Sequence, residues 1–365
     1  MKNLFMTIFK FTFKDRIKDF REKNKGEWGQ FFLNNAIFFV ILSMIAVIII
    51  LEPSFLSVRV FTNILRQSSV RLILAFGVAG IIILQGTDLS LGRQVGFAAV
   101  ITGSLLQAPD YANRFYPDLW LTSQPVFVKL IFPLLVAMLV MGAISVVNGL
   151  IAAIFKVHPF IVTLGTSVTV YGILSLYFGS GAPGPQPIGG YDVDYSAFVN
   201  GYFFQTESFK GIPNLIVYAI IVSIIVWVLW NKTKFGKDMF AVGGNPEAAK
   251  VSGVNVVKTF VLVYLMAGIM YALGGFLEAA RIGSSNNSTG FGYELDAIAA
   301  CVVGGISFSG GVGKVSGAIA GVLMFTIIAY GMNYLGLDVF YQYIIKGIII
   351  VAAVALDTRK YLKKS

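Results

Sequence analysis

The 365-residue chain contains one cysteine and one histidine. Cys301 alone excludes a disulfide framework and a cysteine metal cluster, and His158 alone excludes a multi-histidine metal site. His158 stands next to Pro159, without a cluster of Cys, Asp or Glu around it. We therefore predict no metal site and no catalytic residues, which disfavours a membrane-embedded enzyme.

Charged residues are also scarce, at 13%, whereas a soluble domain carries about 25%. Hydrophobic residues make up 56% of the chain, and the mean hydropathy is +0.78. The apolar residues form long runs such as Phe127–Phe155 and Ile212–Trp230, and a run of about 20 is typical of a membrane-spanning helix. The composition thus predicts an all-α, polytopic membrane protein.

About ten spans are expected. They cover residues 34–51, 70–85, 94–108, 127–155, 160–178, 212–230, 259–280, 293–308, 315–334 and 340–356. Basic residues concentrate in cytoplasmic loops of membrane proteins, and most of the 28 Lys and Arg fall there if both termini lie inside. The same rule explains the net charge of +10 without nucleic acid as a partner.

Two terminal segments flank the expected transmembrane domain at 34–356. Residues 1–33 are rich in Lys and Arg and lack the apolar core and cleavage site of a signal peptide. Phe5, Phe9 and Phe13 recur there at roughly helical spacing, which favours an amphipathic segment against cytoplasmic membrane lipid; a disordered tail is the alternative. Residues 357–365 are expected to form a basic cytoplasmic tail.

The first unusual feature inside the apolar region is the sequence G-T-D-L-S-L-G-R at 86–93. It separates two apolar blocks that are short for spans. An unpaired Asp88 within the bilayer would cost about 2.5–3.5 kcal/mol. Arg93 or the free N–H groups of a helix start are the expected partners, and Ser90 is suited to cap that start.

A second interruption, Gly304–Gly313, occurs in the other half of the chain and contains Ser307 and Ser309. Glycine-interrupted segments at matching places in two halves point to a transport site on broken helices. The alternative is that the glycines only permit tight helix packing. The glycines do not form a nucleotide-binding loop, because Phe308 and Val315 occupy positions that need Gly and Ser or Thr.

Four motifs together resemble one known family. They are G-T-D-L-S-L-G-R at 86–93, N-P-E-A-A-K-V-S-G-V-N at 245–255, E-L-D-A-I-A-A-C-V-V-G-G at 294–305 and S-F-S-G-G-V-G at 307–313. They are similar to motifs of the ATP-binding-cassette (ABC) sugar-importer permeases of the ribose and galactose class. The resemblance covers roughly residues 35–360.

The resemblance implies a non-catalytic permease subunit that works by alternating access in a bacterial cytoplasmic (inner) membrane. Implied partners are a second copy of the chain, an ATPase with two fused cassettes that binds ATP and Mg, and an extracytoplasmic sugar-binding protein. The chain itself would hold no cofactor. The implied cargo is galactose, glucose or a methyl-galactoside, with ribose or a nucleoside as the alternative.

An ion-coupled secondary carrier is a further alternative from another class. It would need paired intramembrane acids that form an ion route. Only Asp88, Glu278 and Asp296 come near that requirement.

The segment E-A-A-x-x-x-G resembles the family's ATPase-docking helix. Asn245 and Pro246 suit the cap and first residue of a helix. The resemblance assigns ATPase docking to Asn245, Pro246, Glu247, Ala248, Ala249 and Gly253.

Candidates for the translocation path are polar or aromatic residues in the apolar region, since a neutral sugar needs hydroxyl partners and aromatic faces. They are Asp88, Ser90, Arg93, Asn148, Thr163, Thr166, Tyr171, Asn286, Tyr293, Ser307 and Ser309. The alternative for each is an ordinary interhelical hydrogen bond. The Gly- and Pro-rich outer loop 179–211 is either a surface for the external protein or a solvated connector.

Overall fold

The computed structural model describes residues 36–206 and 211–362. The segment predicted over 1–33 lies outside the described residues. The helices are α3 (Ala36–Leu51), α4 (Val58–Ile83), α5 (Leu91–Leu105), α6 (Val126–Ile154), α7 (Pro159–Gly179), α8 (Val193–Asn200), α9 (Asn214–Lys232), α10 (Lys234–Gly244), α11 (Pro246–Val251), α12 (Val256–Ile282), α13 (Tyr293–Val303), α14 (Val315–Tyr334) and α15 (Val339–Leu362). Two short strands, β1 (Tyr202–Phe203) and β2 (Ile212–Pro213), pair antiparallel.

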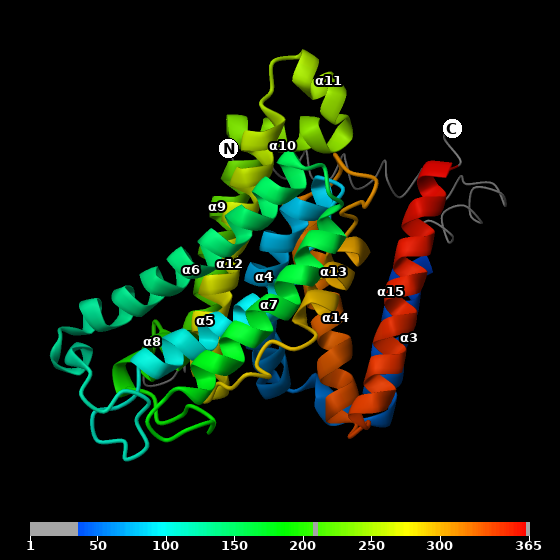
Figure 1. Cartoon of the computed structure of the whole chain (residues 1–365). Coiled ribbons are helices and arrows are strands. Elements are labelled where there is room, and N and C mark those ends of the chain that lie inside the picture. Colours follow the sequence, from blue (N-terminus) through cyan, green and yellow to red (C-terminus); the bar gives the residue numbers. More distant parts are fainter. Residues whose placement is uncertain (1–35, 207–210, 363–365) are drawn as a thin grey trace, which may run out of the picture.

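The predicted all-α membrane architecture is confirmed. Six helices of the described chain, α4, α6, α7, α9, α12 and α14, have the length and composition of a membrane span, and α3 and α15 carry shorter apolar stretches. Two further predicted spans fall on α5 and α13, which have only 15 and 11 residues. Each of the ten predicted spans overlaps one of these helices. Figure 1 shows α10 and α11 at one end of the long helices and α8 at the other.

Two predicted boundaries are wrong. Helix α4 begins at Val58 rather than near residue 70, because Ser57 caps it by accepting from the N–H of Val60 at 3.4 Å. The span predicted over 293–308 is helical only to Val303, and Gly305 follows with a φ of +83°. Helix α15 continues to Leu362, beyond its apolar stretch Val339–Ala355, so the segment predicted as a tail begins in helical form.

Helix α12 packs against α4, α5 and α6 at very short range. A Cβ on Gly268 would lie 2.5 Å from the carbonyl oxygen of Met141 in α6. A Cβ on Gly275 would lie 2.5 Å from the carbonyl oxygen of Val95 in α5. Small residues at such positions allow helix backbones to approach closely in a membrane.

We expect Gly268→Val to lower the thermal stability of the detergent-solubilised protein. The added side chain would meet the α6 backbone, and overpacking of this kind costs about 1–3 kcal/mol. Gly347→Val is the matched control, because a Cβ on Gly347 meets no atom within 4 Å. An unfolding midpoint unchanged in Gly268→Val would contradict the close crossing of α6 and α12.

Candidate functional site

Asp88 lies fully buried in the turn between α4 and α5. Its Oδ1 accepts from the backbone N–H of Ser90 at 2.8 Å and from the Ser90 hydroxyl at 2.5 Å. The Tyr271 hydroxyl donates to Oδ2 at 3.1 Å. The expected backbone partner is thus present, but Ser90 directs its hydroxyl to Asp88 instead of capping α5.

Arg93 is not the partner of Asp88, so that alternative is wrong. Its guanidinium carbon lies 4.2 Å from the ring centre of Tyr171 and 5.1 Å from that of Phe291. The Tyr171 and Phe291 side chains are 40% and 58% exposed. Arg93, Tyr171 and Phe291 therefore form a half-exposed group of one cation and two aromatic rings on α5, α7 and the loop before α13.

The hydrogen bonds around Asp88 continue into α6 and α7. The Ser90 hydroxyl accepts from Gln94 at 2.9 Å and from Asn148 at 3.3 Å. Ser145 donates to Gln94 at 3.0 Å, and Thr166 donates to Asn148 at 2.5 Å. These residues, with Asp88 and Tyr271, are called the buried network below.

Thr163 fixes the same turn from the side of α7. Its hydroxyl accepts from the N–H of Leu89 at 3.1 Å and lies 3.3 Å from the carbonyl oxygen of Thr87, to which it donates. Asp88, Ser90, Asn148 and Thr163 are each at most 1% exposed. In this conformation they hold helices together and present no surface to a solute.

Tyr293 belongs to a different group, which lies near the end of α12 and the start of α13. Its hydroxyl donates to Glu278. Arg281 donates to the same carboxylate through Nε at 2.6 Å and Nη2 at 2.7 Å. Asp296 pairs with Lys346 at 2.9 Å and with Arg71 at 3.7 Å. Glu278 and Asp296 thus each have their own cations, which gives no support to an ion route between these acids.

The other candidate path residues lie apart. Asn286 is in the loop between α12 and α13, where its Oδ1 accepts from the N–H of Ser288 at 2.8 Å. Ser307 is buried in the turn between α13 and α14, and its hydroxyl accepts from the N–H of Ser309 at 3.1 Å. The candidate path residues therefore lie in several separate places and do not line one common pocket.

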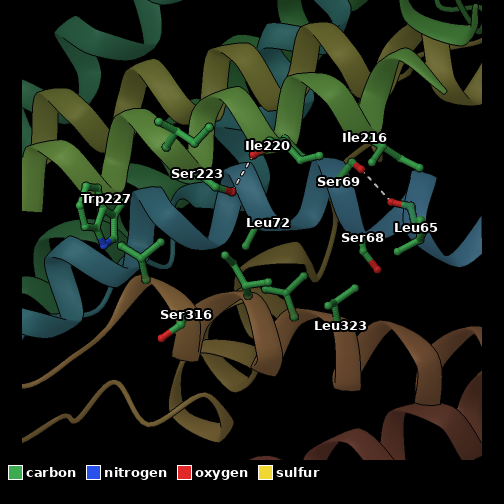
Figure 2. A pocket seen from close by; sticks show the side chains of 15 residues that line it. Leu65, Ser68, Ser69, Leu72, Ile216, Ile220, Ser223, Trp227, Ser316 and Leu323 are labelled. Atoms are coloured by element: carbon green, nitrogen blue, oxygen red, sulfur yellow. Dashed lines mark hydrogen bonds between the residues drawn. The ribbon is translucent and has the colours of Figure 1, made fainter. Parts of the chain in front are cut away.

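A pocket of about 430 Å³ opens between α4, α9 and α14 (Figure 2). Its lining carries no charged side chain, and its polar side-chain groups are four serine hydroxyls and the indole N–H of Trp227. Ser69 and Ser223 donate to carbonyl groups of their own helices, at 2.7 and 2.6 Å. Such a lining offers few partners for sugar hydroxyl groups.

A second pocket, of about 330 Å³, is lined by residues that all carry a polar or charged group. It lies where α4 begins and where α12 and α14 end, on the side opposite α10 and α11. Its lining residues are Asn63, Arg66, Gln67, Arg281, Tyr330 and Asn333. Sequence reasoning missed this set, because the residues are polar positions at helix ends and come from three distant segments.

The segment that resembles the docking helix forms α11, which projects from the end of the long helices (Figure 1). Asn245 Oδ1 accepts from the N–H of Ala248 at 3.0 Å, and Pro246 is the first helical residue. Ala249 faces inward, whereas Glu247 is exposed and Val251 is 90% exposed. Gly253 turns the chain with a φ of +83°. The arrangement presents a short helix with one free face.

The described part of the loop 179–211 contains packed structure. Tyr195 of α8 is fully buried, and Lys129 pairs with Asp192 and Asp194 at 3.1 and 3.0 Å. The Tyr191 hydroxyl donates to Ser285 at 3.0 Å, and burial raises the pKa of Tyr191 above its usual value. This part of the loop is therefore no freely solvated connector.

Comparison with known proteins supports one family. The family model described as "Branched-chain amino acid transport system / permease component" matches residues 60–354. The galactose/methyl galactoside import permease of Haemophilus influenzae is 53% identical over 94% of this chain and 98% of its own length. That of Escherichia coli K12 is 51% identical over 93% and 98%.

A ribose import permease from Bacillus subtilis is less similar, at 35% identity over 87% of this chain and 90% of its own length. No solved structure matches the chain. The family match covers most of the chain and the relatives align almost end to end, so this chain belongs to this family of transport-system permease components.

Proposed function

We propose that this chain is the membrane-spanning permease subunit of an ATP-driven ABC importer for galactose and methyl galactosides. The observation that carries the proposal is 51–53% identity to galactose/methyl galactoside import permeases over at least 93% of the chain. Identity to the ribose permease is lower, at 35%. The galactoside class is therefore favoured over ribose.

The proposed assembly contains two copies of the permease, an ATPase with two fused cassettes and an extracytoplasmic binding protein. The free face of α11 suits docking to the ATPase, which would bind ATP and Mg. Helix α15 ends on the same side as α10 and α11 (Figure 1), in agreement with a cytoplasmic C-terminus in a bacterial inner membrane. No residue of this chain is assigned a catalytic role.

The exposed face of α7 and the start of α13 suit a translocation path between two copies. Arg93 would donate hydrogen bonds to sugar hydroxyl groups, and the rings of Tyr171 and Phe291 would pack on the apolar face of a sugar. The polar pocket between α4, α12 and α14 suits the first contact with solute on the outer side. Alternating access would open these surfaces in turn.

The test is uptake of labelled galactose into proteoliposomes that contain the permease and its neighbouring ATPase, with the binding protein added outside. We expect uptake to require ATP and to be inhibited by excess methyl galactoside but not by excess ribose. Uptake that does not require ATP and depends on an ion gradient would overturn the importer assignment. Stronger inhibition by ribose would overturn the choice of sugar only.

A further inference from the structure

Three segments that are far apart in the sequence meet at the C-terminal end of α10. They are the end of α4, the end of α10 and the turn between α13 and α14. The side-chain amide of Gln85 donates to the carbonyl oxygen of Gly243 at 2.9 Å and to that of Ser309 at 3.1 Å. The N–H of Gly311 donates to the carbonyl oxygen of Ile83 at 2.9 Å. These contacts are called the three-way junction below.

The three-way junction has no free space between its backbones. A Cβ on Gly243 would lie 1.9 Å from the carbonyl oxygen of Ile83. A Cβ on Gly310 would lie 2.2 Å from the carbonyl oxygen of Gly243, and one on Gly311 would lie 2.7 Å from the Cα of Gly244. Close-packed segments transmit displacement to one another, so α10 cannot move without moving both turns.

Gln85 has an unusual backbone conformation for a residue with a side chain. Its φ is +63°, in the left-handed region that residues other than glycine seldom adopt. This conformation coincides with the two hydrogen bonds that its amide makes to α10 and to the second turn. Such a strained residue is held in place by its surroundings and is often part of a mechanism.

The junction is also connected to the buried network. Gln85 is three residues before Asp88, and the intervening turn is fixed by Thr163. A Cβ on Gly86 would lie 3.1 Å from the ring of Pro159, the first residue of α7. A displacement of α10 therefore reaches the starts of α5 and α7 through one short stretch of chain.

We propose that Gln85 is a positioning residue that couples the docking segment α10–α11 to both helix interruptions. The inference rests on the proposed ATPase docking at α11. ATP-driven movement of α11 and α10 would pass through the Gln85 amide to the turn before α5 and to the turn before α14. Gln85 touches neither the sugar nor the ATPase in this scheme.

The test compares Gln85→Met and Gln85→Gly in proteoliposomes with the ATPase and the binding protein. Methionine keeps the length of the side chain but cannot donate to the two carbonyl groups. Glycine relieves the positive φ and also removes the amide. We expect both variants to bind the ATPase as the wild type does and to transport about tenfold less galactose per ATP hydrolysed, in the range of typical coupling effects.

Asn231→Ala is the matched control. It removes an amide-to-carbonyl hydrogen bond of the same length, 2.9 Å, that stays within α9, so its transport per ATP should equal that of the wild type. An unchanged ratio in Gln85→Met would overturn the coupling role while docking stands. Normal coupling in Gln85→Gly alone would also overturn it, because the amide would then be dispensable and the loss in Gln85→Met would come from a side chain held at a positive φ without its hydrogen bonds. Failure of the wild type to bind the ATPase would instead overturn the proposed function and this inference with it.

Discussion

Glu247→Arg is expected to abolish ATP-driven sugar uptake while the permease stays folded. Glu247 is exposed in the first turn of α11, where its charge favours the helix by only about 0.3–1 kcal/mol. At a docking contact with the ATPase, a charge of the wrong sign costs several kcal/mol. We therefore expect uptake to fall by about a hundredfold or more, and co-purification with the ATPase to be lost.

Glu52→Arg is the matched control for this charge reversal. Glu52 is an exposed carboxylate in the connection between α3 and α4, on the side opposite α11. This variant should co-purify with the ATPase and transport sugar as the wild type does. Normal uptake by Glu247→Arg would exclude α11 as the docking helix, and loss of its folded peak in size-exclusion chromatography would exclude a purely interfacial role for Glu247.

Asp88→Ala is expected to lower the free energy of unfolding by about 3 kcal/mol. Asp88 accepts from the N–H and the hydroxyl of Ser90 and from the hydroxyl of Tyr271. Each buried polar group left without a partner costs about 1–3 kcal/mol, and partial relaxation will recover some of that loss. The measurement is the thermal unfolding midpoint of the solubilised protein, together with uptake in proteoliposomes.

Asp88→Asn and Asp118→Ala complete this experiment. Asparagine keeps one carbonyl acceptor for Ser90, so it should lose less stability than alanine. Asp118 is exposed in the loop between α5 and α6, and its substitution should leave the midpoint unchanged. A fully stable and active Asp88→Ala variant would mean that the buried network does not depend on this carboxylate.

Most of the membrane-spanning helices were predictable from sequence because long apolar runs suffice to identify membrane spans. The start of α4 was not, since Arg59, Asn63 and Arg66 interrupt the apolar pattern in its first turns. These residues lie at the end of α4 that is opposite α10 and α11, and Arg66 donates there to Asn200 Oδ1 at 2.7 Å. Asn63, for example, donates to the Tyr330 hydroxyl at 3.3 Å.

The candidate site was predictable only where its contacts are local. Asn245 and Pro246 indicate a helix start by themselves, and Ser90 is two residues from Asp88. Tyr271 is 183 positions from Asp88, so no local pattern connects the two. Gln85 carries no signal in the sequence, because its role follows from two carbonyl groups supplied by other turns.

The shortness of α5 has a consequence for the order of synthesis. Its 15 residues extend about 22 Å, less than the roughly 30 Å of bilayer hydrocarbon. The surface that receives α5 includes Gly275 of α12, which leaves the ribosome long after α5 does. The N-terminal half therefore reaches its final arrangement only after α12 has been made. A nascent chain that stops before Val256 should leave the face of α5 that contacts α12 uncovered and open to membrane quality-control proteases.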